Sequence, residues 1–205
     1  MAKKIVTNEE LSNMTKDERF SLLSKREKIY FNLMKSTSGV LFITSKPGLA
    51  KSSMAKEIAR IMGYNYLDVR LSTADETDFG MPKLKVLEIN GIKYDVHAMT
   101  VPEWAIEANE TPTIIHFEEL NRCSLGVRNA CLGVLLERTI GTKFKFNENV
   151  LMIASGNLGS DGADVEEFDS ALNNRLIHRK HDLLAPEWIE QYAQYHIHPL
   201  IVSFI

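Results

Sequence analysis

Long apolar runs and cysteines are scarce in this chain, and each scarcity removes a class of protein. No apolar stretch approaches the roughly 20 residues that cross a bilayer, so we expect no membrane span. The first residues, Met-Ala-Lys-Lys-Ile-Val, precede a polar stretch instead of the apolar core of a secretory signal. With only two cysteines, Cys123 and Cys131, a disulfide framework is not expected and a reducing compartment is favoured. We therefore expect a cytoplasmic protein.

The chain also lacks a strong excess of charge, internal repeats and low-complexity segments. Its net charge of −3 argues against a surface that coats nucleic acid. Hydrophobic residues at 44% and charged residues at 25% are ordinary for a globular protein. A chain of 205 residues can bury a full core, so one large domain, or one domain and a fragment, is expected.

Apolar strands alternate with helical patterns along the sequence. Residues 8–37 have a helical pattern, and further helices are predicted over Ser52–Met62, Pro102–Ala108, Leu125–Arg138, 168–178 and 187–195. Strands are predicted over Val40–Thr44, Tyr66–Leu71, Thr113–Phe117 and Val150–Ser155. Such alternation with short connections predicts an α/β fold with a layered sheet.

Two hairpins are predicted outside this sheet. Asn90-Gly91 lies between the β-like runs Lys85–Ile89 and Ile92–Val96, and this dipeptide is a strong signal for a tight hairpin turn. The alternating stretch Lys143–Phe146 is typical of one arm of an exposed hairpin. Either hairpin could be an ordinary surface feature.

The stretch Ser45-Lys46-Pro47-Gly48-Leu49-Ala50-Lys51-Ser52 has the layout of a P-loop, a turn between a buried strand and a helix that holds phosphate. Lys51 would reach the β- and γ-phosphates, and the Ser52 hydroxyl would bind Mg²⁺. Ser45 and Ala50 occupy the two positions where the usual motif has glycine. Taken alone, the stretch is also compatible with an ordinary strand–turn–helix that carries a surface lysine.

Three later segments carry further candidate residues. Glu118 and Glu119 directly follow the strand 113–117, where an acid pair could hold the Mg²⁺ shell and deprotonate a water. Asn157 ends the strand 150–155 and could orient that water. Arg175 could reach a neighbouring subunit's phosphate. The alternatives are solvated acids, a turn asparagine and an arginine at a helix end.

The order and wording of these segments resemble a MoxR-type AAA+ ATPase. The resemblance covers residues 40–205 and rests on Pro47–Ser52, Phe117–Arg122 and Asp169–Arg175, with Asn157 between them. Four further segments resemble the MoxR group that works beside von Willebrand factor A-domain proteins; they are Asp68–Ser72, Asp78–Pro82, Pro102–Trp104 and Pro186–Glu190.

This resemblance implies a P-loop NTPase (AAA+) three-layer αβα sandwich with a mostly parallel five-stranded sheet. It divides the chain into an N-terminal helical segment (1–37), the nucleotide-binding core (38–185) and the truncated start of a helical lid (186–205). It implies that ATP and Mg²⁺ are bound, with Ser52 and Glu118 at the metal, Glu119 as catalytic base, Asn157 as sensor 1 and Arg175 as the arginine finger. The nucleotide-binding residues would be Pro47, Gly48, Leu49, Ala50, Lys51, Ser52 and Ser53.

The family also implies a ring oligomer, commonly a hexamer, that remodels a partner such as a von Willebrand factor A-domain protein. By the same resemblance, the two predicted hairpins could face a pore or a substrate. Glu118 departs from the family's usual aspartate, and we expect altered rather than abolished hydrolysis. Two alternatives stay open, a nucleotide-dependent binding module with weak hydrolysis and a nucleic-acid motor. The pairs His178/His181 and His196/His198 are read as surface residues rather than metal ligands, and His116 as a core residue. Arg122 is either an ion-pair partner of the acids or a contact to a neighbour.

Overall fold

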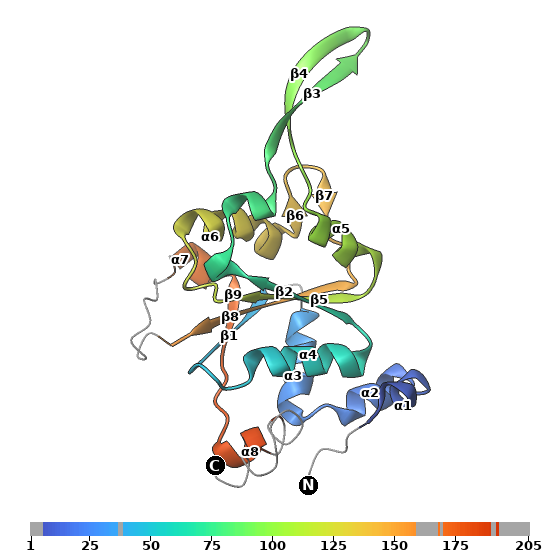
Figure 1. Cartoon of the computed structure of the whole chain (residues 1–205), viewed down its shortest axis with the longest axis vertical. Helices are drawn as coiled ribbons and strands as arrows, with labels where there is room; N and C mark the ends of the chain where they lie inside the picture. Colours follow the sequence, from blue (N-terminus) through green and yellow to red (C-terminus); the bar gives the residue numbers. More distant parts are fainter. Residues whose placement is uncertain (1–5, 37–38, 159–167, 169, 190–191, 193–205) are drawn as a thin grey trace.

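A five-stranded, all-parallel sheet forms the centre of the molecule (Figure 1). The structure, a computed structural model, describes residues 6–36, 39–158, 168, 170–189 and 192. In spatial order the sheet contains β2 (Asn65–Arg70), β5 (Thr113–Glu118), β8 (Val150–Asn157), β1 (Val40–Ser45) and β9 (Leu176–Lys180). Because all strands run in one direction, their carboxyl ends meet at one edge, where ligands bind in such sheets.

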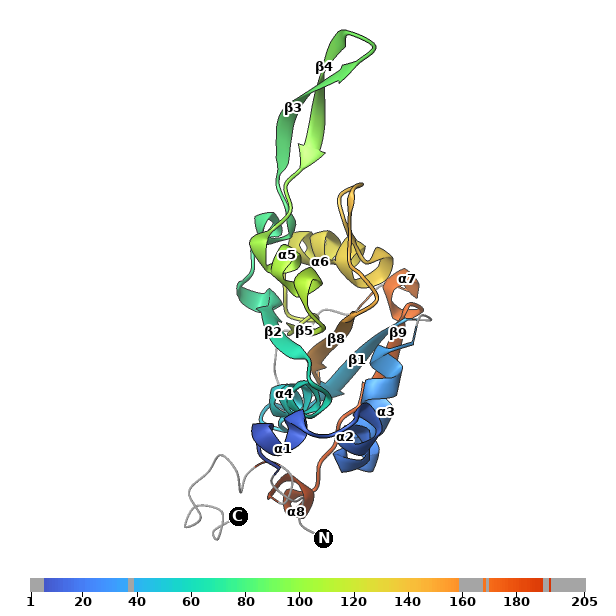
Figure 2. The same ribbon diagram turned by 90° about the vertical axis from the view of Figure 1, so that its right-hand side faces the viewer.

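Helices cover both faces of this sheet (Figures 1 and 2). On one face lie α3 (Lys25–Met34) and α4 (Lys51–Met62), and on the other lie α5 (Glu103–Glu110) and α6 (Leu125–Leu132). Successive residues of β1 alternate between the two hydrophobic clusters: Leu41 and Ile43 pack toward α3 and α4, whereas Val40 and Phe42 pack on the opposite side. The predicted αβα sandwich is therefore confirmed.

A five-stranded sheet was expected from the resemblance, but the location of its fifth strand, β9, was not predicted. Residues 168–178 were expected to be helical, but the described part of this segment contains only the short helix α7 (Ser170–Asn173) before β9 begins. β9 pairs with β1 from Val40↔Leu176 to Thr44↔Lys180, and Leu176 is its only buried residue. An edge strand with so few buried side chains has no clear apolar pattern, so backbone pairing decides its conformation.

The N-terminal segment is divided into three helices, not one. These are α1 (Asn8–Ser12), α2 (Lys16–Leu22) and α3. Thr7, Thr15 and Ser24 cap them, each forming a reciprocal pair of hydrogen bonds with the glutamate three residues later. Each capping box satisfies the first N–H groups of the helix that follows it. The boxes at Thr15 and Ser24 therefore start new helices, and they divide the segment into three.

Several short elements lie between or after the sheet strands. They are the 3₁₀ turns η1 (Leu71–Thr73) and η2 (Glu76–Phe79), the π-helical turn η3 (Gly133–Glu137) that extends α6, the paired strands β6 (Thr139–Ile140) and β7 (Phe144–Lys145), and α8 (Ala185–Trp188). α5 begins at Glu103 with Pro102 as its N-cap, one residue later than the predicted start at Pro102. Within the part of the chain that the structure describes, no helix has both the length and the apolar character needed to cross a bilayer.

The two predicted hairpins differ in their surroundings. β3 (Pro82–Ile89) and β4 (Ile92–Met99) pair around Asn90 and Gly91, both at positive φ, and project far from the sheet (Figures 1 and 2). The expectation of an exposed hairpin at 143–146 is only partly correct. Phe146 is buried and its ring stacks on Trp104, so aromatic packing holds the base of this hairpin against α5.

Candidate functional site

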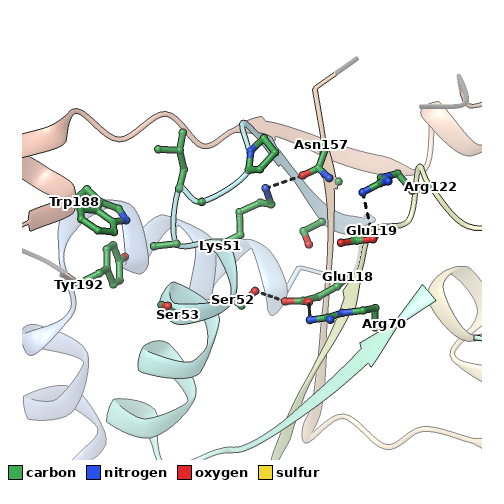
Figure 3. Close-up of a pocket in the computed structure, with 16 residues that line it drawn as sticks. Lys51, Ser52, Ser53, Arg70, Glu118, Glu119, Arg122, Asn157, Trp188 and Tyr192 are labelled. Carbon is green, nitrogen blue, oxygen red and sulfur yellow. Dashed lines mark hydrogen bonds and ion pairs between the residues drawn. The ribbon is translucent and has the colours of Figure 1, made fainter. Parts of the chain in front are cut away.

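A pocket of about 540 Å³ lies at the carboxyl ends of β1, β5 and β8 (Figure 3). Every predicted site residue except Arg175 lines it: Pro47, Gly48, Leu49, Ala50, Lys51, Ser52, Ser53, Glu118, Glu119 and Asn157. Its size is within the usual range for small-molecule sites. Parallel pairing of β5 and β8 with their neighbours brings these residues together, although they are separated by up to 110 positions in sequence.

The P-loop, residues 45–52, leads from β1 into α4. Gly48 and Ala50 both have left-handed backbones, with φ of 80° and 58°. Ala50 is the N-cap of α4 and makes no side-chain capping hydrogen bond, and the first turn of α4 contains no acidic residue. In contrast, α1, α2 and α3 each have a capping side chain and a glutamate in the first turn. The positive dipole end at the start of α4 is therefore not neutralised by a side chain of its first turn, and it can attract an anion in the pocket.

Lys51 extends from α4 across the P-loop. Its Nζ lies 2.9 Å from Ser45 Oγ and 3.3 Å from Asn157 Oδ1. The side chain of Asn121 fixes the Asn157 backbone, because its amide donates to the Asn157 carbonyl and its carbonyl accepts from the Asn157 N–H. The ammonium is thus held between the ends of β1 and β8.

Glu118, at the end of β5, lies beside Ser52 and is only 6% exposed. Ser52 Oγ donates a hydrogen bond to Glu118 Oε1, and Arg70 Nη2 lies 3.2 Å from Glu118 Oε2. Burial alone would raise the pKa of this carboxyl, but the Ser52 hydrogen bond and the Arg70 charge outweigh it and hold the pKa below its usual value. An ionised carboxylate beside a serine hydroxyl is an oxygen donor set that Mg²⁺ accepts.

Glu119 follows Glu118 in a left-handed backbone conformation, with φ of 60°. Its carboxylate lies 3.8 Å from Arg122 Nη1 and is about one-third exposed. The next residue, Leu120, donates its N–H to the Ser155 carbonyl, which locks the end of β5 to β8. Non-glycine residues in this conformation cluster at functional sites, where the surrounding structure holds the strain.

Arg175 lies outside the pocket of its own chain. It precedes β9, and its exposed guanidinium lies 4.0 Å from Glu137 Oε1. The structure does not bring Arg175 to Lys51 or Glu119. Asp169, which begins the expected arginine-finger segment, lies outside the described residues, as does most of the predicted lid segment 186–205.

Six residues that line the pocket were not proposed as site residues from the sequence: Arg70, Arg122, Ser155, Gly156, Trp188 and Tyr192. Arg70 ends β2 in register with Glu118, so only the pairing of β2 with β5 reveals their ion pair. Trp188 of α8 and Tyr192 form an aromatic wall at the end of the pocket away from Glu119 (Figure 3).

Two histidines of the described chain, His116 and His181, are buried. His116 is fully buried, with Tyr66 Oη 2.8 Å from Nδ1 and Ser155 Oγ 2.9 Å from Nε2, and burial lowers its pKa to about 4. It is the core residue that was expected. His181, expected at the surface, is instead fully buried against the P-loop. Among residues that the structure describes, no three His, Cys, Asp or Glu side chains form a metal-binding group.

Comparisons with known proteins support the fold. No family model matches the sequence, and no curated protein sequence matches it. The crystal structure of a "putative ATPase" from Cytophaga hutchinsonii aligns with a TM-score of 0.58 at 16% identity, over 87% of this chain and 53% of that one. NtrX from Brucella abortus aligns with a TM-score of 0.49 at 19% identity, over 92% and 48%.

The chain therefore spans about half the length of each of these two proteins. At such low identity the first alignment establishes the fold alone. Together with the sheet order and the P-loop at the end of β1, it shows that the chain has a three-layer αβα P-loop fold.

Proposed function

We propose that this chain binds ATP with Mg²⁺ and hydrolyses it, as a MoxR-type AAA+ ATPase. One observation carries the proposal, namely that Lys51, Ser52, Glu118, Glu119 and Asn157 line one pocket at the ends of three adjacent parallel strands. Each has the chemistry that phosphoryl transfer needs at that place, a cation, a hydroxyl, two carboxylates and an amide.

The pocket residues fit a nucleoside triphosphate and a divalent cation. Lys51 and the uncapped start of α4 offer positive charge to phosphate oxygens, and Ser52 and Glu118 offer oxygens to the cation. When bound, Mg²⁺ neutralises charge on the β- and γ-phosphate oxygens. Trp188 and Tyr192 supply an apolar wall for the base end of a nucleotide.

Glu119 and Asn157 would act on the attacking water. Glu119 is the more exposed of the two acids and is not engaged by Ser52, so its carboxylate can accept a proton from the water. The Asn157 side chain, already aligned with Lys51, would orient the same water. Arg122 pairs with Glu119 and holds it at the mouth of the pocket.

The proposed active form is a ring, with a hexamer as the family's usual size, in which each site is completed by the next subunit. The exposed position of Arg175, outside the pocket of its own chain, supports a role in the neighbouring subunit's site. An arginine supplied in this way is worth roughly 10³–10⁵ in rate. Hydrolysis would then remodel a partner protein, and the sequence segments noted above favour a von Willebrand factor A-domain protein.

Phosphate release by the purified chain tests the enzymatic part. We expect Mg²⁺-dependent release by the wild type, loss of release and of ATP binding in Lys51→Ala, and loss of release with retained ATP binding in Glu119→Gln. Release no greater than that of Lys51→Ala would refute hydrolysis. Retained ATP binding with ATP-dependent assembly in that case would support the alternative of a nucleotide-dependent binding module.

Mixing two inactive variants tests the shared site. Glu119→Gln subunits keep Arg175, and Arg175→Ala subunits keep Glu119, so a mixed ring contains some sites with both residues intact. We expect phosphate release to reappear on mixing. If the mixture stays as inactive as its components while both variants still assemble with the wild type, Arg175 does not act on a neighbour.

A further inference from the structure

Ala50 holds a backbone conformation that its side chain disfavours. Its φ of 58° lies in the left-handed region, which glycine adopts freely and alanine adopts at a cost of roughly 1–2 kcal/mol. This conformation sets the direction in which the P-loop enters α4. A strained residue of this kind persists only where surrounding contacts hold it.

His181 makes a hydrogen bond next to this strained residue. It lies just beyond β9 and is completely buried, and its Nε2 lies 3.0 Å from the Leu49 carbonyl oxygen. A carbonyl only accepts, so Nε2 carries the proton, and Nδ1 is left as the acceptor facing the Tyr30 hydroxyl at 3.4 Å. The His181 backbone N–H also donates to the Thr44 carbonyl at 2.8 Å. His181 therefore contacts the chain at two points, at Thr44 just before the P-loop and at Leu49 within it.

The bond to Leu49 acts directly on Ala50. The Leu49 carbonyl and the Ala50 N–H belong to the same planar peptide unit. Rotation of that plane changes φ of Ala50, so a hydrogen bond that fixes the Leu49 oxygen also fixes the left-handed φ. We infer that His181 is a positioning residue for the P-loop, holding the Leu49–Ala50 peptide in the orientation that nucleotide binding requires.

This inference rests on the proposed nucleotide site. It assigns no contact between His181 and the nucleotide, because His181 is not among the residues that line the pocket. Its effect therefore passes through Leu49 and Ala50. A merely structural histidine would affect folding but would not be coupled to the residue type at position 50.

The test is a set of variants that separates donor, shape and backbone strain. His181→Phe keeps a ring without a donor, His181→Gln keeps an N–H donor, and both are made with Ala50 and with Ala50→Gly. His178→Phe is the matched control, because His178 is exposed on β9 and its ring lies against Phe42, away from the P-loop. Binding of Mg·ADP is measured by calorimetry.

We expect His181→Phe to weaken Mg·ADP binding about tenfold, the effect of leaving one buried carbonyl unpaired. His181→Gln should stay within about threefold of the wild type, since it restores a donor. With Ala50→Gly, the loss caused by His181→Phe should shrink to about threefold or less, because glycine needs no help to stay left-handed. The control should bind as the wild type does.

Equal binding by His181→Phe and wild type would overturn the inference, and so would a Gln variant as weak as the Phe variant or a loss unchanged by Ala50→Gly. If His181→Phe does not fold, His181→Leu replaces it in the same comparisons. If the wild type itself binds no Mg·ADP, the proposed function fails. Amide hydrogen exchange of residues 45–54 in the nucleotide-free proteins then decides the inference, which predicts faster exchange in the Phe variant and is overturned by equal exchange.

Discussion

Acidification should destabilise this protein through His181. The side chain is buried against Tyr30 and the Leu49 carbonyl, and burial lowers its pKa from 6.5 to about 4. The nearby charges of Arg26 and Lys51 lower the pKa further, whereas the Leu49 carbonyl and Asp182 raise it. The folded protein therefore keeps His181 neutral at a pH where the unfolded chain would protonate it.

Proton linkage gives the sign and the size of the effect of pH on the free energy of unfolding. Between pH 6.5 and about 4 the unfolded state binds more protons at this site, so the free energy of unfolding falls as pH falls, and the full contribution is present only above pH 6.5. With these two pKa values, lowering the pH from 7.5 to 5 should remove about 2 kcal/mol of stability. This is a large fraction of the 5–15 kcal/mol typical of a domain.

Urea unfolding at pH 7.5 and pH 5 measures this loss in the wild type and in His181→Gln. Other groups, including the buried His116, contribute to both proteins, so the difference between the two pH-induced losses isolates His181. We expect the wild type to lose about 2 kcal/mol more than the glutamine variant. An equal loss in both proteins would refute the argument that burial at this position keeps the imidazole neutral.

Three further predictions concern other parts of the chain. Gly63→Ala should lower the free energy of unfolding by about 1–2 kcal/mol in urea titrations, since Gly63 has φ of 74°, a left-handed backbone that alanine adopts only at a cost; no loss would contradict it. Replacing residues 83–98 by a short turn should leave the unfolding free energy of the core unchanged within about 0.5 kcal/mol, because β3 and β4 mainly contact each other. Glu118→Asp should keep phosphate release within about threefold of the wild type, whereas Glu118→Gln should lower it at least tenfold, since charge at this position matters more than length; equal activities would refute this.

The sequence predicts the central layers well because they carry strong local signals. β5 and β8 are continuous apolar runs whose residues are almost all buried, and α4 ends at Gly63 as its sequence indicates. The signals for the N-terminal helices were also present, since Thr15 and Ser24 each precede a glutamate at the capping-box spacing. A helical pattern over the whole segment conceals them. β9 could not be predicted in this way, because only its pairing with β1 makes it a strand.

The candidate site also contains some residues that the sequence predicts and others that only the tertiary structure reveals. Lys51, Ser52, Glu118 and Asn157 belong to segments whose order in the sequence predicts a common edge of the sheet, and in the structure they line one pocket. Arg70 and His181 have no such signal. Arg70 meets Glu118 only because β2 and β5 pair in that register, and His181 reaches Leu49 from 132 residues away. Contacts of this kind depend on tertiary packing, which a single sequence does not display.

Specific contacts explain how the P-loop forms without glycine at the two positions where the usual motif has it. Ser45 replaces the first glycine and is completely buried, and its hydroxyl accepts a hydrogen bond from Lys51 while donating to the Lys46 carbonyl. Ala50 replaces the second, and its left-handed backbone is adjacent to the carbonyl that His181 holds. Glycine would supply freedom at both positions, whereas this chain supplies specific partners. Because a fixed loop loses less conformational entropy when a ligand binds, the substitutions favour a preorganised phosphate site rather than a defective one.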